Sequence, residues 1–448
     1  MTALCSGRLL AALCLLSAAS ITVTCDAAEW PEWRGPGQQG QSPEASGLPL
    51  TWSEAENVVW KTPIPGRGHS TPVIEGDRIW ITTALETPAD PADANARLEA
   101  NTGGQPLTLL EKVWLHALCI DRNSGAILHN VPLIKQEKPQ WVHKLNSYAS
   151  PSPVLADGKL FAHFGAFGTA AVDALTGQVL WTNLDADLVV MHENGPGSSP
   201  VVWKDKLIFH LDGSDRQFIV ALDTATGKVA WKTPRSGKLG DNPQLRKSYA
   251  TPIFFPLPDG STELLSPAAD WLYAYNPSTG QERWKVSYGH LGFSNVARPV
   301  TGHGMLYVPT CFMKSKMQAY AYDGSRPPKL AWEITRSMPN QPSPVLAGEE
   351  IYIIDDRAVA TCADARTGQV HWQERLGGGG NVSASPVFAD GRIYVVTQEG
   401  KTHVLKPGKT YEVLAENQLS SPIMASPVPA GRALFLRTEQ ALFRIEEK

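Results

Sequence analysis

Residues 173–181 read DALTGQVLW, and the same phrase returns along the chain. The other close copies are DTATGKVAW at 223–231, NPSTGQERW at 276–284 and DARTGQVHW at 364–372. In each copy Asp or Asn stands first, Gly follows four positions later and Trp eight positions later. Asp or Asn opens a turn by bonding its own backbone, and Gly supplies the positive φ that the turn needs. The phrase therefore predicts a tight turn followed by a strand that places Trp on a buried face.

Two weaker copies and one isolated ending extend the series. Residues 121–129 read DRNSGAILH, with His in place of Trp, and the copy at 323–332 is one residue longer. Trp60, in NVVWKTP, has the ending with no phrase before it. Successive copies start 41 to 53 positions apart, which is the size of a four-stranded propeller blade. The residues expected to carry this structural repeat are Trp60, Asp173, Gly177, Trp181, Asp223, Gly227, Trp231, Gly280, Trp284, Trp332, Asp364, Gly368 and Trp372.

A second phrase marks the start of each blade. Ser, Thr or Arg is followed by Pro and an aliphatic residue, then by a tight turn and an apolar strand. Pro is tolerated at the first position of a strand because no ladder donor is needed there. Asp-Gly at 157–158 and at 390–391 is a strong hairpin signal. The eight starts, which predict eight blades, are Thr71-Pro72-Val73, Ser152-Pro153-Val154, Ser199-Pro200-Val201, Thr251-Pro252-Ile253, Arg298-Pro299-Val300, Ser343-Pro344-Val345, Ser385-Pro386-Val387 and Ser426-Pro427-Val428.

The last of these starts leaves room for only three strands before Lys448. We expect Asn57–Ile64, which carries the isolated Trp60, to supply the missing outer strand, because pairing the two ends removes an open sheet edge. The sequence therefore predicts an all-β fold, an eight-bladed β-propeller of four-stranded antiparallel blades closed by an N-terminal strand. The propeller is expected over residues 52–448 as one domain, after an N-terminal extension over residues 28–51.

The first residues have the pattern of an export signal. Arg8 precedes an apolar run from Leu9 to Val23, which is too short for a comfortable membrane span. We expect residues 1–27 to be a signal peptide, and the mature protein to lie in the periplasm or cell envelope without a transmembrane span. Cys25 offers a second interpretation, a lipoprotein acylated at that cysteine. Plain secretion is favoured, because Thr22-Val23-Thr24 does not match a lipobox.

One insertion interrupts the repeat in the first blade. Residues 84–113 add about 28 residues. Within them, Pro91-Ala92-Asp93 followed by ANARLEA predicts a short capped helix. Insertions into repeats tend to mark one working face. The insertion is either a lid over the central funnel or a solvated excursion, and the sequence leaves both interpretations open.

Composition and charge agree with this fold. Hydrophobic residues are 42%, charged residues are 19%, and 38 Gly and 35 Pro suit many short strands and turns. A net charge of −4 without a basic run lacks the electrostatic footprint of nucleic-acid binding. After cleavage Cys119, Cys311 and Cys362 remain, an odd and sparse set that predicts buried reduced thiols. No phosphate-binding loop, G-x-S-x-G, H-E-x-x-H or C-x-x-C motif is present.

The repeated DxxTGxxxW and its Ser-Pro-Val lead resemble the quinoprotein-type propeller repeat, named after pyrroloquinoline quinone (PQQ). The resemblance covers nearly all of the mature chain. The stretch WPEWRGP at 30–36 is similar to the start of exported members in planctomycete-like bacteria. The family holds two unlike groups, the alcohol and glucose dehydrogenases that bind the quinone, and a non-catalytic group similar to the lipoprotein of the outer-membrane barrel assembly machine. The resemblance implies the fold and leaves the function open.

The dehydrogenase group implies definite chemistry. Its quinone is flat and anionic, is held by Ca²⁺ through carboxylate and amide oxygens, and packs against a Trp. In many members adjacent cysteines form a disulfide cap, and an Asp takes the substrate proton. This chain has no Cys-Cys pair, and no motif identifies a carboxylate cluster. We therefore expect no cofactor and no catalytic or metal-binding residue, with PQQ and calcium as the alternative.

Propellers bind ligands at the funnel mouth, where the loops that lead into the innermost strands converge. In this chain those loops are rich in His, Asn and aromatic residues. They would form a polar pocket for a ligand, a metal or a peptide, although the central channel of any propeller is wet and polar. The funnel candidates for ligand binding are His69, His143, Asn146, His192, Glu193, Asn194, Asn295 and Arg298.

The favoured function is an exported, non-catalytic propeller, expected as a monomer, that acts as a binding or protein-interaction scaffold in the cell envelope. Its partner would be an envelope protein or a small polar ligand. One alternative is a quinone-dependent dehydrogenase with PQQ and calcium. The other is a carbohydrate-binding or carbohydrate-processing propeller, which an exposed Trp such as Trp141 beside paired carboxylates in the funnel would favour.

Overall fold

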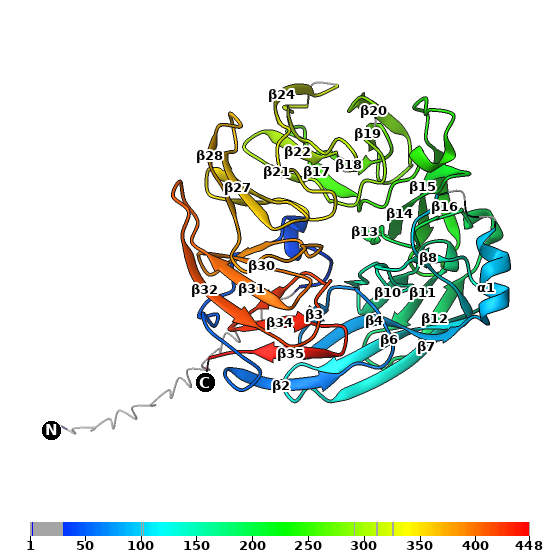
Figure 1. The fold of residues 1–448 in the computed structure, drawn as a ribbon, viewed down its shortest axis with the longest axis horizontal. Coiled ribbons are helices and arrows are strands. Elements are labelled where there is room, and N and C mark those ends of the chain that lie inside the picture. Colours follow the sequence, from blue (N-terminus) through cyan, green and yellow to red (C-terminus); the bar gives the residue numbers. More distant parts are fainter. Residues whose placement is uncertain are drawn as a thin grey trace.

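The computed structural model confirms an eight-bladed β-propeller of four-stranded antiparallel blades. Its sheets surround a central axis and follow one another around the ring in sequence order (Figure 1). The structure describes residue 2 and residues 30–447, apart from residues 100, 102, 291, 311, 325 and 326. The expected signal peptide over residues 1–27, including Cys25, and the thiol of Cys311 lie outside the described residues.

Each of the first four blades uses four main strands, and the innermost strand is the shortest. The first blade contains β3 (Val73–Glu75), β4 (Arg78–Pro88), β6 (Leu110–Asp121) and β7 (Ile127–Glu137). The second contains β9 (Val154–Ala156), β10 (Lys159–His163), β11 (Thr169–Asp173) and β12 (Val179–Asn183). The third contains β13 (Val201–Trp203), β14 (Lys206–Asp212), β15 (Gln217–Asp223) and β16 (Val229–Pro234). The fourth contains β17 (Ile253–Pro256), β18 (Thr262–Pro267), β19 (Trp271–Tyr275) and β20 (Glu282–Ser287).

The remaining blades repeat this order. The fifth contains β21 (Val300–Gly302), β22 (Met305–Pro309), β23 (Met317–Ala321) and β24 (Lys329–Ile334). The sixth contains β25 (Val345–Ala347), β26 (Glu350–Ile354), β27 (Val359–Asp364) and β28 (Val370–Arg375). The seventh contains β29 (Val387–Ala389), β30 (Arg392–Val396), β31 (Lys401–Leu405) and β32 (Val413–Gln418), with β1 (Gln41–Ser42) parallel to β29. The eighth contains β33 (Val428–Ala430), β34 (Ala433–Arg437), β35 (Ala441–Ile445) and β2 (Val58–Pro63).

The turn at the start of each repeat phrase forms as the sequence predicts. The Asp173 carboxylate accepts hydrogen bonds from the backbone N–H and the hydroxyl of Thr176, both at 2.8 Å. These bonds favour the charged carboxylate and lower the pKa of Asp173. Gly177 has a φ of 74°, which an L side chain rarely adopts. Asp223 and Asp364 make the same two kinds of bond in their own copies.

The tryptophans of the repeat join neighbouring blades. Trp181, half-buried on β12, donates its indole N–H to the Thr224 carbonyl of the third blade at 3.1 Å. A Cβ atom on Gly227 would lie only 2.5 Å from the Trp181 ring. The glycine of one turn is therefore needed both for its positive φ and for the tryptophan of the blade before it. The same contact joins Trp231 to Gly280, Trp332 to Gly368 and Trp60 to Gly125.

Two copies depart from this pattern. His129, which replaces Trp in the first copy, lies with its Nε2 atom 3.1 Å from the Leu175 carbonyl and packs against Gly177. Trp284 donates its indole N–H to the Glu263 carboxylate at 2.8 Å. The position eight residues after the Asp or Asn therefore keeps its contact with the next blade even when Trp is absent.

The residue that opens each innermost strand links adjacent blades near the axis. The bonds run from the backbone N–H of one residue to the hydroxyl of the next. They form one open series, which starts at Arg298 and passes through Ser343, Ser385, Ser426, Thr71, Ser152 and Ser199 to Thr251. Arg298 has no hydroxyl, so the series does not close between Thr251 and Arg298. Instead its guanidinium donates to the Pro252 carbonyl of the fourth blade at 2.9 Å.

The eighth sheet combines both ends of the propeller. β2 pairs antiparallel with β35 (Figure 1). In this pairing Trp60 lies opposite Arg444. The Trp60 indole N–H donates to the Arg122 carbonyl of the first blade at 3.0 Å. Residues 57–64 therefore contribute the outer strand of the last sheet and also contact the blade that follows it in the ring.

The remaining elements lie outside the eight main sheets. They are α1 (Pro91–Leu98), β5 (Leu107–Thr108), β8 (Val142–His143) and the 3₁₀ turns Pro36–Gln38, Gly165–Phe167, Ala186–Leu188 and Pro243–Leu245. α1 confirms the predicted short helix, and the Asp90 side chain caps it by accepting the Ala92 N–H at 2.9 Å. Residues 84–88 and 110–113 of the expected insertion extend β4 and β6 as paired strands. β5 pairs with β8, which ties the insertion to the loop that leads into the second blade.

The described cysteines agree with the prediction of buried thiols. Cys119 and Cys362 are buried and form no disulfide. Burial raises the pKa of the Cys119 thiol to about 12 and that of the Cys362 thiol to about 11, so neither is a thiolate near pH 7. Within the described part of the chain, no helix has the length and apolar character that crossing a membrane requires.

Candidate functional site

The segment 30–42, here called the plug, lies in the central channel of the ring, where its dark blue trace is visible near the axis (Figure 1). Trp30 exchanges backbone hydrogen bonds of 2.9 and 2.8 Å with Ile74, on the innermost strand of the first blade. The Gly40 carbonyl accepts the Phe388 N–H of the seventh blade at 2.9 Å. Further bonds connect the plug to the second, fourth, fifth, sixth and eighth blades. The plug therefore lies inside the ring and contacts seven of the eight blades.

Buried arginines hold the plug in place. The Arg34 guanidinium is buried and donates to the Pro386 carbonyl of the seventh blade at 2.8 Å. Arg298, buried in the fifth blade, donates to the Trp33 carbonyl at 2.6 Å and to the Glu32 carboxylate at 3.3 Å. Burial raises the pKa of Glu32, and the nearby charge of Arg298 opposes this rise. These bonds satisfy backbone carbonyls that would otherwise be buried without donors.

A cavity of about 600 Å³ opens next to Trp33, at the mouth of the ring. Its wall comes from the mouth loops, the loops that precede the innermost strands, of all eight blades, with Gly103 and Gln105 added by the insertion. Because the plug occupies the channel beyond Trp33, we infer that the cavity opens only at the mouth. Its main polar and aromatic lining residues are Trp33, His69, Gln105, His143, Asn146, Asn194, Gln244, Lys247, Tyr249, Phe293, Phe312, Asn340, Gln341 and Asp356.

Four of the eight funnel candidates line this cavity, namely His69, His143, Asn146 and Asn194. The Asn146 amide donates to the Asn194 carbonyl at 2.8 Å, and its Oδ1 atom accepts the Ser150 hydroxyl at 2.5 Å. Asn146 therefore fixes the shape of its loop. His69 and His143 are half-buried at the cavity, and the Nε2 atom of His69 has no hydrogen-bond partner among the described residues.

The other four candidates are not among the lining residues, although they lie on mouth loops as expected. His192 is 5% exposed, and burial lowers its pKa to about 4. All four side chains bond to the protein itself. His192 Nε2 accepts the Ala166 N–H at 2.6 Å, and Glu193 accepts the Ser214 hydroxyl at 3.0 Å. Asn295 donates to the Ala268 carbonyl at 2.9 Å, and Arg298 donates to the plug. These four side chains therefore stabilise the loops and the plug around the cavity and do not line it.

The lining of the cavity is close to neutral near pH 7. Burial lowers the pKa of His69 to about 3, so its imidazole is uncharged. Burial lowers the pKa of Lys247 to about 8, and its ammonium donates to the Gln244 side chain at 2.5 Å. Burial raises the pKa of Asp356, whose Oδ2 atom accepts the Asn340 N–H at 2.6 Å. The lining thus offers one cationic group, one carboxyl group and many uncharged amides and hydroxyls.

The donor set does not fit a metal-bound quinone. Ca²⁺ takes six to eight oxygen ligands, most of them carboxylates or carbonyls. Among the lining residues Asp356 supplies the carboxyl group, and its raised pKa disfavours the charged form. No group of three or more His, Cys, Asp or Glu side chains in the described ranges is arranged to hold a metal ion. An anionic quinone would meet a single lysine, Lys247, and no arginine in the lining.

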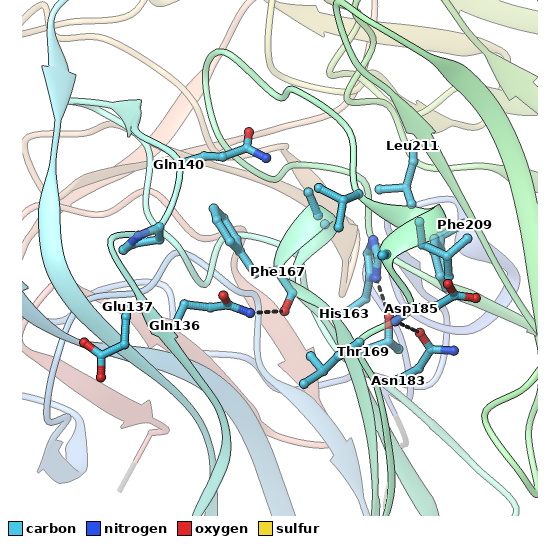
Figure 2. Close-up of a pocket in the computed structure, with 18 of the residues that line it drawn as sticks. Gln136, Glu137, Gln140, His163, Phe167, Thr169, Asn183, Asp185, Phe209 and Leu211 are labelled. Atoms are coloured by element: carbon cyan, nitrogen blue, oxygen red, sulfur yellow. Dashed lines mark hydrogen bonds between the residues drawn. The ribbon is translucent and has the colours of Figure 1, made fainter. Parts of the chain in front are cut away.

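A second cavity, of about 320 Å³, lies between the first, second and third blades (Figure 2). The His163 ring stacks on Phe209 with centroids 3.9 Å apart, and its Nδ1 atom lies 2.8 Å from the Thr169 hydroxyl. The Gln136 amide donates to the Phe167 carbonyl at 3.2 Å. The Nε2 atom of His163 has no hydrogen-bond partner among the described residues. This cavity is about half the volume of the funnel cavity and is lined by three blades, whereas the funnel cavity is lined by all eight, so the funnel cavity is the stronger candidate.

No pattern in the sequence marks Trp33, Lys247, Phe312 or Asp356 as lining residues. Trp33 lies in the stretch that is similar to the start of exported family members. The residues of that stretch do not indicate that Trp33 enters the channel. Phe312 and Asp356 lie on loops between the second and third strands of their blades. In antiparallel blades these loops emerge on the same face as the mouth loops, so strand order alone would have indicated them.

Comparison with known proteins identifies the family. The family described as outer membrane protein assembly factor BamB matches residues 50–182, 116–255 and 215–448. The chain belongs to this family. The matched residues span the ring from before β2 to the end of β35, so the family repeat coincides with the blades, and the expected PQQ-like repeat is confirmed.

The relatives include both an assembly factor and dehydrogenases. Outer membrane protein assembly factor BamB of Yersinia pestis is 24% identical over 270 residues, 58% of this chain and 64% of that protein. Polyvinylalcohol dehydrogenase of Sphingopyxis sp. (strain 113P3) is 24% identical over 319 residues, 60% of this chain and 45% of that protein. The chain thus matches less than two thirds of either relative. A europium-containing methanol dehydrogenase has the same fold, with a TM-score of 0.62, 15% identity and coverage of 92% of this chain and 90% of that one.

Proposed function

We propose that this chain is an exported, non-catalytic propeller of the cell envelope that binds a partner protein or a small polar ligand at the mouth of the funnel cavity. The observation that carries this proposal is a cavity built by mouth loops from all eight blades, with Trp33 of the plug in its lining. Sites of this kind are usually loops held by a rigid scaffold. Membership of the BamB family agrees with a role in the envelope.

The absence of catalysis is proposed from the chemistry of the lining. General acid–base catalysis needs a titrating group placed to move a proton, commonly with a second group that orients it. Asp356 and Lys247 are the charged lining residues, and each is already bonded to a neighbouring amide. His69 is uncharged near pH 7 and is bonded only weakly to the Ser150 hydroxyl, at 3.4 Å. This set favours recognition over proton transfer.

A photo-crosslinking experiment tests the binding face. Leu145 lies at the cavity and is 56% exposed, whereas Leu175, at an outer turn of the second blade, is 62% exposed. A photoreactive amino acid is placed at either position in the full chain, and cells are irradiated. We expect a defined crosslinked product from position 145 and none from the matched control at position 175. Products from position 175 alone would place recognition on another face and overturn the proposal.

The second candidate function is a quinone-dependent dehydrogenase, favoured by the match to polyvinylalcohol dehydrogenase. Purified protein is mixed with PQQ and either Ca²⁺ or a lanthanide ion, followed by absorbance spectra, metal analysis and dye-linked oxidation of methanol and poly(vinyl alcohol). We expect no saturable complex, because the cavity lacks the carboxylates that would hold the ion. A stoichiometric complex that turns over would replace the binding proposal with this one.

A further inference from the structure

We propose that the ligand of the funnel cavity is the end of a neutral oligosaccharide chain, which enters through the mouth and stops at Trp33. This inference rests on the proposed function, since it takes the funnel as the binding site. It adds the chemical class of the ligand and the way in which the ligand enters. Three features of the lining support it: uncharged hydrogen-bonding groups, aromatic surfaces and a closed inner end.

The uncharged polar groups suit hydroxyls. A sugar hydroxyl both donates and accepts, and side-chain amides do the same in a fixed geometry. Gln105 and Gln341 line the cavity from opposite parts of the chain, the insertion and the sixth mouth loop. His69 also lines the cavity, its Nε2 atom is buried without a hydrogen-bond partner among the described residues, and its imidazole is neutral. Such a group bonds a hydroxyl without requiring a charged ligand.

The charges of the lining disfavour ionic ligands. Burying a charge without a partner costs several kcal/mol in an apolar site. Lys247 donates to Gln244, and the Glu193 carboxylate near it partly offsets its charge. Asp356 accepts the Asn340 N–H. A ligand with two or more phosphates or carboxylates would find no cation left to neutralise most of its charge, whereas a neutral ligand has no such cost.

Aromatic side chains provide the complementary apolar surfaces. Trp33, Tyr249, Phe293 and Phe312 line the same cavity as the amides. Phe312 is 49% exposed at the mouth and meets Phe293 edge-on, with ring centroids 5.7 Å apart. Sugar rings carry hydroxyls at their edges and C–H groups on their faces. They therefore bury apolar area against aromatic rings while their edges reach polar groups.

The closed inner end selects a chain terminus and disfavours a peptide. Since the plug contacts seven of the eight blades beyond Trp33, we infer that a polymer does not thread through the ring. A peptide that entered by its end would bring a charged amino or carboxyl group to an inner surface made by Trp33, Ser152 and Ser199, which carries no opposite charge. The end of a neutral glycan carries only hydroxyls and has no such penalty.

Calorimetric titration of the full-length mature protein tests ligand class and mode of entry. The probes are linear cello-, xylo- and malto-oligosaccharides of three and six units, trigalacturonate, and a pentapeptide with free termini. We expect at least one neutral series to bind with a Kd of about 10 µM to 1 mM. Its trimer and hexamer should bind within about threefold of each other, because only the terminal units enter. Trigalacturonate and the peptide should bind at least about tenfold more weakly.

A matched pair of exposed residues locates the binding. Phe312 lines the cavity, while its neighbour Met313, 67% exposed, does not. Phe312→Ala should weaken binding of the neutral ligand about tenfold, and Met313→Ala should leave it within about twofold. Gln341→Ala should weaken it about two- to tenfold, the range for one lost hydrogen bond. Unchanged melting temperatures would show that these effects are not caused by unfolding.

The possible outcomes separate this inference from the proposed function. Four results would each overturn the oligosaccharide inference. They are no binding by any neutral series, tighter binding of trigalacturonate or the peptide, affinity that rises steeply with chain length, and equal effects of Phe312→Ala and Met313→Ala. Crosslinking from position 145 would still support a binding propeller in those cases. Loss of that crosslink together with oligosaccharide binding at Phe312 would instead overturn the protein-partner branch of the proposed function and retain the ligand.

Discussion

Substitution of Gly227 by Ala tests the contact that joins the blades. Gly227 has a φ of 70°, and its new Cβ atom would lie 2.5 Å from the Trp181 ring. The left-handed backbone costs an L residue about 1–2 kcal/mol, and overpacking a close contact costs about 1–3 kcal/mol. We therefore expect Gly227→Ala to lower the free energy of unfolding by about 2–5 kcal/mol.

Gly158→Ala is the matched control. Gly158 also has a positive φ, of 69°, but a Cβ atom there would meet nothing within 4 Å. The backbone cost and the entropy that Ala removes from the unfolded chain are shared by both variants. The difference between them, about 1–3 kcal/mol, measures the contact with Trp181.

Guanidinium unfolding monitored by circular dichroism measures both variants, with parallel slopes as the condition for comparing midpoints. Trp181→Ala in the Gly227→Ala background provides a second test, because removing the ring removes the clash. The double variant should therefore be less destabilised than the sum of the two single variants by about 1–3 kcal/mol. Equal destabilisation by Gly227→Ala and Gly158→Ala, or strict additivity with Trp181→Ala, would refute the reasoning.

Three further substitutions probe the ring and the plug. Trp60→Ala should lower the free energy of unfolding by about 2–3 kcal/mol. This is less than the roughly 3–5 kcal/mol of a fully buried tryptophan, because Trp60 is half-exposed on β2. An unchanged melting temperature would show that β2 does not stabilise the last blade. Arg34→Met should lower the free energy of unfolding by about 2–4 kcal/mol, because buried carbonyls in the sixth and seventh blades lose a charged donor. A melting temperature equal to that of the wild type would contradict this. The pKa of His192 is about 4 in the folded protein and about 6.5 in the unfolded chain, so the unfolded chain binds a proton first as the pH falls. The contribution of His192 to stability is therefore fully present above about pH 6.5 and is lost as the pH falls toward 4. His192→Gln should therefore flatten the decline of the melting temperature between pH 7 and 5, and parallel curves would show that His192 does not titrate there.

The fold was predictable because its signals are local. The turn that starts at Asp173 is held by bonds within four residues, and the Asp-Gly hairpin at 157–158 forms between adjacent strands. The turn phrase recurs in six of the eight blades and the Ser/Thr/Arg-Pro start in all eight, so an error in one copy is corrected by the others. The Trp–Gly contact is different, because Trp181 and Gly227 are far apart in sequence and meet only after neighbouring blades have packed. Repeat spacing indicates both residues and does not show that they touch.

The site was only partly predictable because a loop position does not fix a side-chain direction. His143 and His192 both lie on mouth loops, yet His143 lines the cavity and His192 bonds to the Ala166 N–H behind it. Buried ion pairs are harder still. Arg235 donates two hydrogen bonds to Asp212, at 3.0 and 2.9 Å, and both side chains are buried. Neither residue belongs to the repeat phrase, so no pattern in the sequence pairs them.

Arg298 connects the architecture of the ring to the floor of the funnel. At the other seven blade starts a Ser or Thr hydroxyl accepts a backbone N–H, whereas Arg298 leaves the Thr251 N–H without this link and reaches the Trp33 carbonyl instead. A hydroxyl is too short to reach the plug. Arg298→Ser should therefore restore the link between the fourth and fifth blades and release the plug. Amide hydrogen exchange should then speed up at residues 30–42 while the innermost strands keep their protection. If exchange in the plug is unchanged, the bonds of Arg34 and of the plug backbone are enough to hold the plug, and Arg298 has only a structural role within the ring.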